Sequence, residues 1–213
     1  MLVIHHLEKS QSERITWLCE ELGLSYELKL YKRDPATILA PPELKALHPQ
    51  GTAPVIEDGG LVLAESGAVM QYILGKYGDS RLAPGPDDPT FAPYLYWFHF
   101  ANGTLQPAMG RNMAMRWLDL PPDNPVQRRM RDRLDRAMDQ VEGRLGEADH
   151  LAGPALTAAD VMMVFSLTTM RVFLPLDLAP YPNILAYLQR IGARPAYQAA
   201  MRKGDPDLVP LLT

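Results

Sequence analysis

Cysteine is scarce in this sequence: Cys19 is the single cysteine among 213 residues. One thiol excludes an internal disulfide framework and any two-cysteine redox motif. Long apolar runs are also missing, since the longest, residues 161–170, is bounded by Asp160 and Arg171 and is too short to span a bilayer. The start, MLVIHH, lacks the basic residues of a signal peptide. We therefore expect a cytoplasmic protein.

A surplus of positive charge is absent as well. The formal net charge is −4, which gives no reason to expect nucleic acid or an anionic membrane surface as a main partner. Hydrophobic residues make up 47% of the chain. At this length the chain can bury one large core or two small ones.

Residues 1–81 have the pattern of a small α/β domain. Apolar residues there recur in the order strand, helix, strand, hairpin, helix, at residues 2–7, 15–22, 26–31, 54–64 and 66–77. Gly23 stands where a glycine commonly ends a helix. The order predicts a sheet with helices packed on it.

Residues 82–90, LAPGPDDPT, predict a linker because prolines, glycine and aspartates break regular structure. Beyond it, residues 91–213 contain helical patterns only, so we expect an all-α domain. The predicted helices lie at residues 91–115, 126–145, 158 onward, 181–192 and 195–203. The first is expected to bend near Pro107, and Thr157 with Asp160 fits a capping box.

Glu65 and Ser66 precede the predicted helix that follows the hairpin. Serine is a strong N-cap residue, and a helix start offers N–H groups that suit a carboxylate. Glu65 can pair with an amine, so the two together suit an amino-acid zwitterion. The alternative is plain capping of the helix. Pro54 belongs at a strand start, because proline has no N–H to donate to the ladder.

Three stretches together carry a family resemblance. They are APVIEDGGLVLAESGAV at 53–69, KSQSERITWLCEELGLSYEL at 9–28 and LTAADV at 156–161. In this order and spacing the chain resembles the cytosolic glutathione transferase family over essentially its whole length. The resemblance implies a thioredoxin-like N-terminal domain, an all-helical C-terminal domain that forms the electrophile pocket, a homodimer and no metal.

The resemblance also implies where glutathione binds. It implies a cis peptide bond before Pro54 and pairing of the Ala53 backbone with the cysteinyl unit, with Thr52 beside it. Glu65 and Ser66 would hold the γ-glutamyl end, which is the zwitterion expected from the residues themselves.

The chemistry needs a group that stabilises the thiolate, because a free thiol titrates near ~8.5 and only the thiolate is nucleophilic. Ser10 and Ser12 are the candidates, and SQSERI resembles the serine-type bacterial and fungal branch. We favour Ser10, which is nearer the preceding strand, and interpret Ser12 as a helix cap. Cys19 is interpreted as core packing rather than as a nucleophile.

The electrophile pocket is expected on the first long helix, with candidate lining residues Phe100, Asn102, Leu105, Arg111 and Met115. The alternative for these residues is domain-interface core. The expected function is attack of activated glutathione on a hydrophobic small-molecule electrophile. Two alternatives stay open: a glutathione-dependent peroxidase or isomerase on the same fold, and a non-catalytic binding module.

Overall fold

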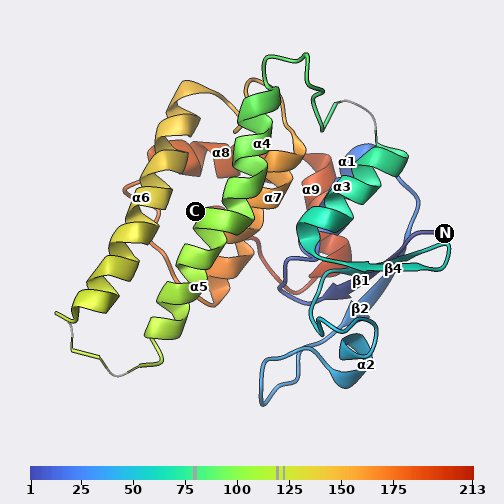
Figure 1. Ribbon diagram of the computed structural model, residues 1–213, viewed down its shortest axis with the longest axis horizontal. Coiled ribbons are helices and arrows are strands. Elements are labelled where there is room, and N and C mark those ends of the chain that lie inside the picture. The colour runs from blue at the N-terminus through green and yellow to red at the C-terminus, as the bar shows by residue number, and fades with distance from the viewer. Residues whose placement is uncertain (79–80, 119, 122) are drawn as a thin grey trace. The chain divides into compact units, whose positions relative to one another are not determined.

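The computed structural model describes residues 1–78, 81–118, 120–121 and 123–213 (Figure 1). They form two compact units. The first unit consists of Met1–Leu82 and Gly192–Pro210, and the second of Ala83–Ile191 and Leu211–Thr213. Within the described ranges, no helix combines the length and the apolar character needed to cross a membrane.

A four-stranded sheet in the order β2-β1-β3-β4 is the centre of the first unit. β1 runs parallel to β2 and antiparallel to β3, and β3 and β4 form an antiparallel hairpin. The turn of the hairpin is Gly59-Gly60, both with positive φ (57° and 90°), which glycine adopts without a steric penalty. The strands are β1 Val3–Leu7, β2 Glu27–Tyr31, β3 Val55–Asp58 and β4 Leu61–Ala64.

Helices pack on both faces of this sheet (Figure 1). α1 contacts β1, α3 and α9. On the opposite face Leu44 of α2 packs against Leu7, as the alternation of side chains along β1 requires. Gly23 ends α1 in the left-handed conformation, with φ 65°, as predicted. The helices are α1 Glu13–Leu22, α2 Pro42–Lys45, α3 Ser66–Tyr77 and α9 Pro195–Gly204.

The place of α9 differs from the domain boundaries expected from the sequence, which put all of residues 91–213 in one helical domain. α9 packs on α1 of the first unit. Arg194 donates two hydrogen bonds of 2.8 Å to the Glu21 carboxylate, and Tyr197 meets the Trp17 ring edge-on, with centroids 5.1 Å apart. These contacts join residues far apart in the chain, so no local pattern indicates them.

In the described part of the second unit, every regular element is a helix or a helical turn. α4, a π-helical turn (η1) and α5 follow one another without a break, so the predicted helix 91–115 is confirmed. The π turn lies just before Pro107, where the missing N–H removes one helical hydrogen bond. The elements are α4 Phe91–Phe100, η1 Ala101–Leu105, α5 Gln106–Met115, α6 Pro125–Glu147, α7 Ala158–Leu167, the 3-10 turn η2 Thr169–Val172 and α8 Pro182–Gly192.

The start of α7 is a capping box, as predicted. The Thr157 side chain accepts from the N–H of Ala159, at 3.3 Å. The Asp160 carboxylate accepts from the Thr157 N–H at 2.8 Å and from the Leu151 N–H at 2.9 Å. Asp160 is fully buried, so it ties the loop before α7 to the helix from inside the core.

Candidate active site

Ser10 and Ser12 lie in the short loop that leads from β1 into α1. Their hydroxyl oxygens are 2.7 Å apart, and the Ser12 N–H donates to Ser10 Oγ at 3.3 Å. Both side chains are buried, but Ser10 keeps 6% of its surface exposed and Ser12 keeps none. Of the pair, Ser10 is therefore the one that can reach a bound molecule.

The interpretation of Ser12 as a side-chain cap was wrong. Ser12 occupies the N-cap position of α1, but its backbone is already helical and its hydroxyl caps no N–H among the described residues of that helix. Instead, Ser12 Oγ turns back to β1, where it accepts from the Leu7 N–H at 3.2 Å. It also lies 3.1 Å from Nδ1 of His6. Hydrogen bonds to the preceding strand have prevailed over the capping rule here.

His6 and Asp205 extend this cluster, and the sequence did not point to either residue. His6 Nε2 lies 3.0 Å from Oδ2 of Asp205, and both side chains are buried. The other carboxylate oxygen of Asp205 accepts from the Lys9 N–H at 2.8 Å. Asp205 follows α9, so the fold brings the two ends of the first unit together at the serine loop.

Glu65 and Ser66 begin α3, but not in the roles that local capping predicts. Glu65 is the residue at the N-cap position, exposed and with a positive φ of 70°. Ser66 is the first residue of the helix and is buried. The expectation that Ser66 is the N-cap was therefore wrong. The Glu65 side chain makes no cap hydrogen bond to this helix, and the positive end of a helix suits an anionic ligand.

A second layer of polar residues supports this helix start, and the sequence analysis missed it. Ser66 Oγ donates to Oε1 of Gln11 at 3.4 Å, and the guanidinium of Arg14 donates to the same oxygen at 2.8 Å. Arg14 is fully buried, and burial lowers its pKa. Gln50 Nε2 donates to Oε1 of Glu65 at 2.8 Å and so orients that carboxylate.

The peptide bond between Ala53 and Pro54 is cis, which confirms the expectation from the resemblance. The paired part of the β3–β4 hairpin begins with Val55 opposite Ala64, so Ala53 lies before the ladder. Pro54 is buried and Thr52 is exposed. Ala53 packs against the cluster formed by Leu7 and Leu44, which fixes this segment on the sheet.

Cys19 takes no part in the cluster. It is fully buried within α1, and burial raises the pKa of its thiol to about 12. A thiol that stays protonated is a poor nucleophile, so the interpretation as core packing is confirmed. Among the described residues, no group of three or more His, Cys, Asp or Glu side chains is arranged to hold a metal ion.

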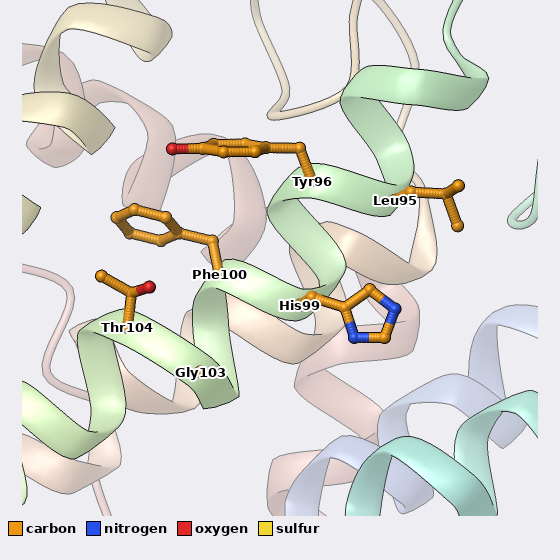
Figure 2. Close-up of a pocket in the computed structure, with 6 residues that line it drawn as sticks. All are labelled: Leu95, Tyr96, His99, Phe100, Gly103 and Thr104. Atoms are coloured by element: carbon orange, nitrogen blue, oxygen red, sulfur yellow. The ribbon is translucent and has the colours of Figure 1, made fainter.

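The second unit carries a surface pocket of about 490 Å³ on α4 and η1 (Figure 2). It is lined by Leu95, Tyr96, His99, Phe100, Gly103 and Thr104. Tyr96, Phe100 and Thr104 are spaced by four residues and point to the same side of the helix (Figure 2).

Phe100 is the one predicted electrophile-site residue that lines this pocket. Leu105 is fully buried and does not line this pocket. Asn102, Arg111 and Met115 are not among the lining residues, and Arg111 is exposed on α5.

Comparison with known proteins agrees with this geometry. Residues 10–74 match the family model "Glutathione S-transferase, N-terminal domain", and residues 124–190 match "Glutathione S-transferase, C-terminal domain". The chain belongs to the glutathione S-transferase family. The first match contains Ser10 and the segment from Thr52 to Ser66.

Individual members of the family are similar over nearly the whole chain. Glutathione S-transferase 3 of Schizosaccharomyces pombe is 30% identical, covering 100% of this chain and 92% of its own. Glutathione S-transferase 1 of Saccharomyces cerevisiae is 31% identical, with 95% of both chains covered. A solved glutathione S-transferase from Actinobacillus pleuropneumoniae superposes with a TM-score of 0.88 at 36% identity, covering 96% of this chain and 93% of that one.

Proposed function

We propose that this protein is a serine-type glutathione transferase, which activates the thiol of glutathione for attack on a hydrophobic electrophile. The observation that carries the proposal is Ser10, which lies in the loop before α1 and keeps 6% of its surface exposed, in a chain of this family. A hydroxyl that donates to the sulfur, together with the positive end of a helix, favours the thiolate over the thiol.

The required stabilisation is modest. A free thiol titrates near ~8.5, and moving that value down by about two units takes roughly 2.7 kcal/mol of preference for the anion. One hydrogen bond to a charged group contributes about 1.5–3 kcal/mol. Ser10 with the α1 dipole is therefore sufficient.

Binding of the peptide itself is assigned to the segment from Thr52 to Ser66. Glu65, oriented by Gln50, pairs with the ammonium of the γ-glutamyl unit. The N–H groups at the start of α3 donate to its carboxylate, and Ser66 is hydrogen-bonded to Gln11. Ala53 offers its backbone to the cysteinyl unit, and Thr52 and Pro54 flank it.

Replacement of Ser10 by alanine is expected to lower kcat for a chloronitrobenzene substrate by about 10- to 100-fold, which corresponds to the loss of one charge-assisted hydrogen bond. The Michaelis constant for glutathione should stay within about threefold, because Ser10 acts on the sulfur and not on the rest of the peptide. Steady-state kinetics, with ultraviolet absorbance of the bound thiolate against pH, measure both effects.

Ser166→Ala is the matched control, because Ser166 is a buried serine in α7 of the second unit. It should leave the thiolate titration unchanged. The proposed role of Ser10 is wrong if Ser10→Ala titrates like the wild type. The proposed function itself is wrong if the wild-type protein binds no glutathione at millimolar concentration in calorimetry.

We also propose that the protein is a homodimer and that its location is cytoplasmic, as the family resemblance and the composition predict. Sedimentation at micromolar concentration should give a species near twice the chain mass of 23.8 kDa. A single species at the chain mass would contradict the dimer.

A further inference from the structure

Four side chains form a continuous line of hydrogen bonds that ends at Ser10. Ser10 Oγ lies 2.7 Å from Ser12 Oγ, Ser12 Oγ lies 3.1 Å from His6 Nδ1, and His6 Nε2 lies 3.0 Å from Asp205 Oδ2. Ser12, His6 and Asp205 are buried, so Ser10 is the accessible end of the line. A serine, a histidine and an aspartate in this order are the parts of a general-base system.

The direction of each hydrogen bond follows from the groups present. A carboxylate only accepts, and Asp205 already accepts from the Lys9 N–H. The ring nitrogen Nε2 of His6 therefore donates to Asp205. In the neutral ring Nδ1 is then an acceptor. Ser12 donates to it at 3.1 Å in preference to the Leu7 carbonyl oxygen, which lies farther from Ser12 Oγ, at 3.4 Å.

The direction of the hydrogen bond between Ser12 and Ser10 follows from the same count of donors and lone pairs. Ser12 Oγ also accepts from the Leu7 N–H, and it has one further lone pair. Ser10 must therefore donate to Ser12. With its own proton engaged, Ser10 presents a lone pair, not a proton, to a bound thiol.

We propose that this line is a proton relay, resting on the proposed function, that carries the glutathione thiol proton through Ser10 and Ser12 to Nδ1 of His6. The S–H bond breaks as a new O–H bond forms on Ser10. Ser10 passes its own proton to Ser12, and Ser12 passes its proton to His6. The electron pair of the S–H bond stays on sulfur, and no other reactant is needed.

After the proton transfer, the side chains of the relay make as many hydrogen bonds as before it. His6 now donates to Ser12, Ser12 donates to Ser10, and Ser10 donates to the new thiolate. The Leu7 N–H still donates to Ser12. The same two serines thus first transfer the thiol proton to His6 and then stabilise the thiolate.

Among the described residues, the ionisable group in direct contact with the His6 ring is Asp205, at the end of α9. Arg33 interacts electrostatically with Asp205. The residue paired with His6 on the neighbouring strand β2 is the apolar Leu30. Asp205 is a positioning residue: it selects the ring tautomer and stabilises the imidazolium.

The neighbouring His5 provides a matched control. It is equally buried on the same strand and also contacts a carboxylate, since its Nε2 lies 2.9 Å from Glu57 Oε1. Its other ring nitrogen lies 2.9 Å from the Tyr31 hydroxyl. Because side chains alternate along β1, His5 faces away from the serines.

His6→Gln should lower kcat/KM by about 100-fold at pH 6.5, the scale of a lost general base. The deficit should shrink as the pH rises above the titration of a free thiol, because solvent then removes the proton. The thiolate absorbance of bound glutathione should appear at higher pH than in the wild type. The dissociation constant of glutathione, measured by calorimetry, should stay within about threefold of the wild-type value.

Asp205→Asn should give the same pH profile, because the amide group reverses the tautomer of His6 and removes the acceptor on Nδ1. Gly204→Ala keeps all four side chains of the line, but its Cβ would lie 2.9 Å from Cε1 of His6 and displace the ring. It should shift the thiolate titration in the same direction. His5→Gln should leave the titration unchanged.

The outcomes separate the relay from the proposed function. If the wild type binds no glutathione, the proposed function fails and the relay with it. If it binds and turns over glutathione while folded His6→Gln and Asp205→Asn titrate like the wild type, the relay alone is wrong. An activity loss that is equal at all pH values, or equal in His5→Gln, indicates a structural role and also overturns the relay.

Discussion

Asp160→Ala is expected to lower the free energy of unfolding by about 3–5 kcal/mol, the cost of removing one partner from a buried polar cluster. The fully buried Asp160 carboxylate accepts from the N–H groups of Leu151 and Thr157. It also accepts from the hydroxyl of Thr157 at 3.2 Å and from that of Tyr187 at 3.1 Å. Alanine removes the acceptor that these buried donors share.

Urea denaturation followed by circular dichroism measures this change. Asp149→Ala is the control, because Asp149 is exposed and lies 4.0 Å from Arg190, a surface pair that contributes about 0–1 kcal/mol. A loss in Asp160→Ala no larger than that of the control would show that the cluster does not hold α7 in place.

Glu65→Gln is expected to weaken glutathione binding by about 10- to 100-fold. The change keeps the size of the side chain and an oxygen for Gln50, but removes the charge that we propose to pair with the γ-glutamyl ammonium. A hydrogen bond to a charged group contributes about 1.5–3 kcal/mol, which sets the expected factor. Titration calorimetry of the two proteins measures it.

A ligand change tests the assignment of that charge to the ammonium. A glutathione analogue in which hydrogen replaces the γ-glutamyl amino group should bind the wild type and Glu65→Gln about equally. Glu43→Gln, on the exposed side of α2, should bind both ligands like the wild type. If Glu65→Gln weakens the binding of glutathione and of the analogue by the same factor, Glu65 acts on another part of the ligand.

Local patterns predicted the elements of the fold well, because each depends on residues close in sequence. The stripe that ends at Gly23, the Gly59-Gly60 hairpin and the capping box at Thr157 were all confirmed. The cis bond before Pro54 was expected through the family resemblance alone, since composition and periodicity carry no information on it.

The polar interior of the site was not predictable in the same way. Ser12 and Ser66 each fit a local capping rule. Their hydroxyls instead form hydrogen bonds outside their own helices, Ser12 with His6 and Ser66 with Gln11. The contact between His6 and Asp205 joins residues 199 positions apart. A hydrogen bond over that distance leaves no periodic signal in one sequence.

The packing of α9 on α1 means that the order of translation and the order of folding differ in this protein. A ribosome releases the strands of the first unit early, but the whole of residues 83–191 follows before α9 is made. Until then Trp17 lacks Tyr197, and His6 lacks the carboxylate that selects its tautomer. The nascent first unit therefore has an uncovered helix face until α9 is made, the kind of surface on which chaperones act. Its serine loop gains its full set of partners only after residue 205 has been added.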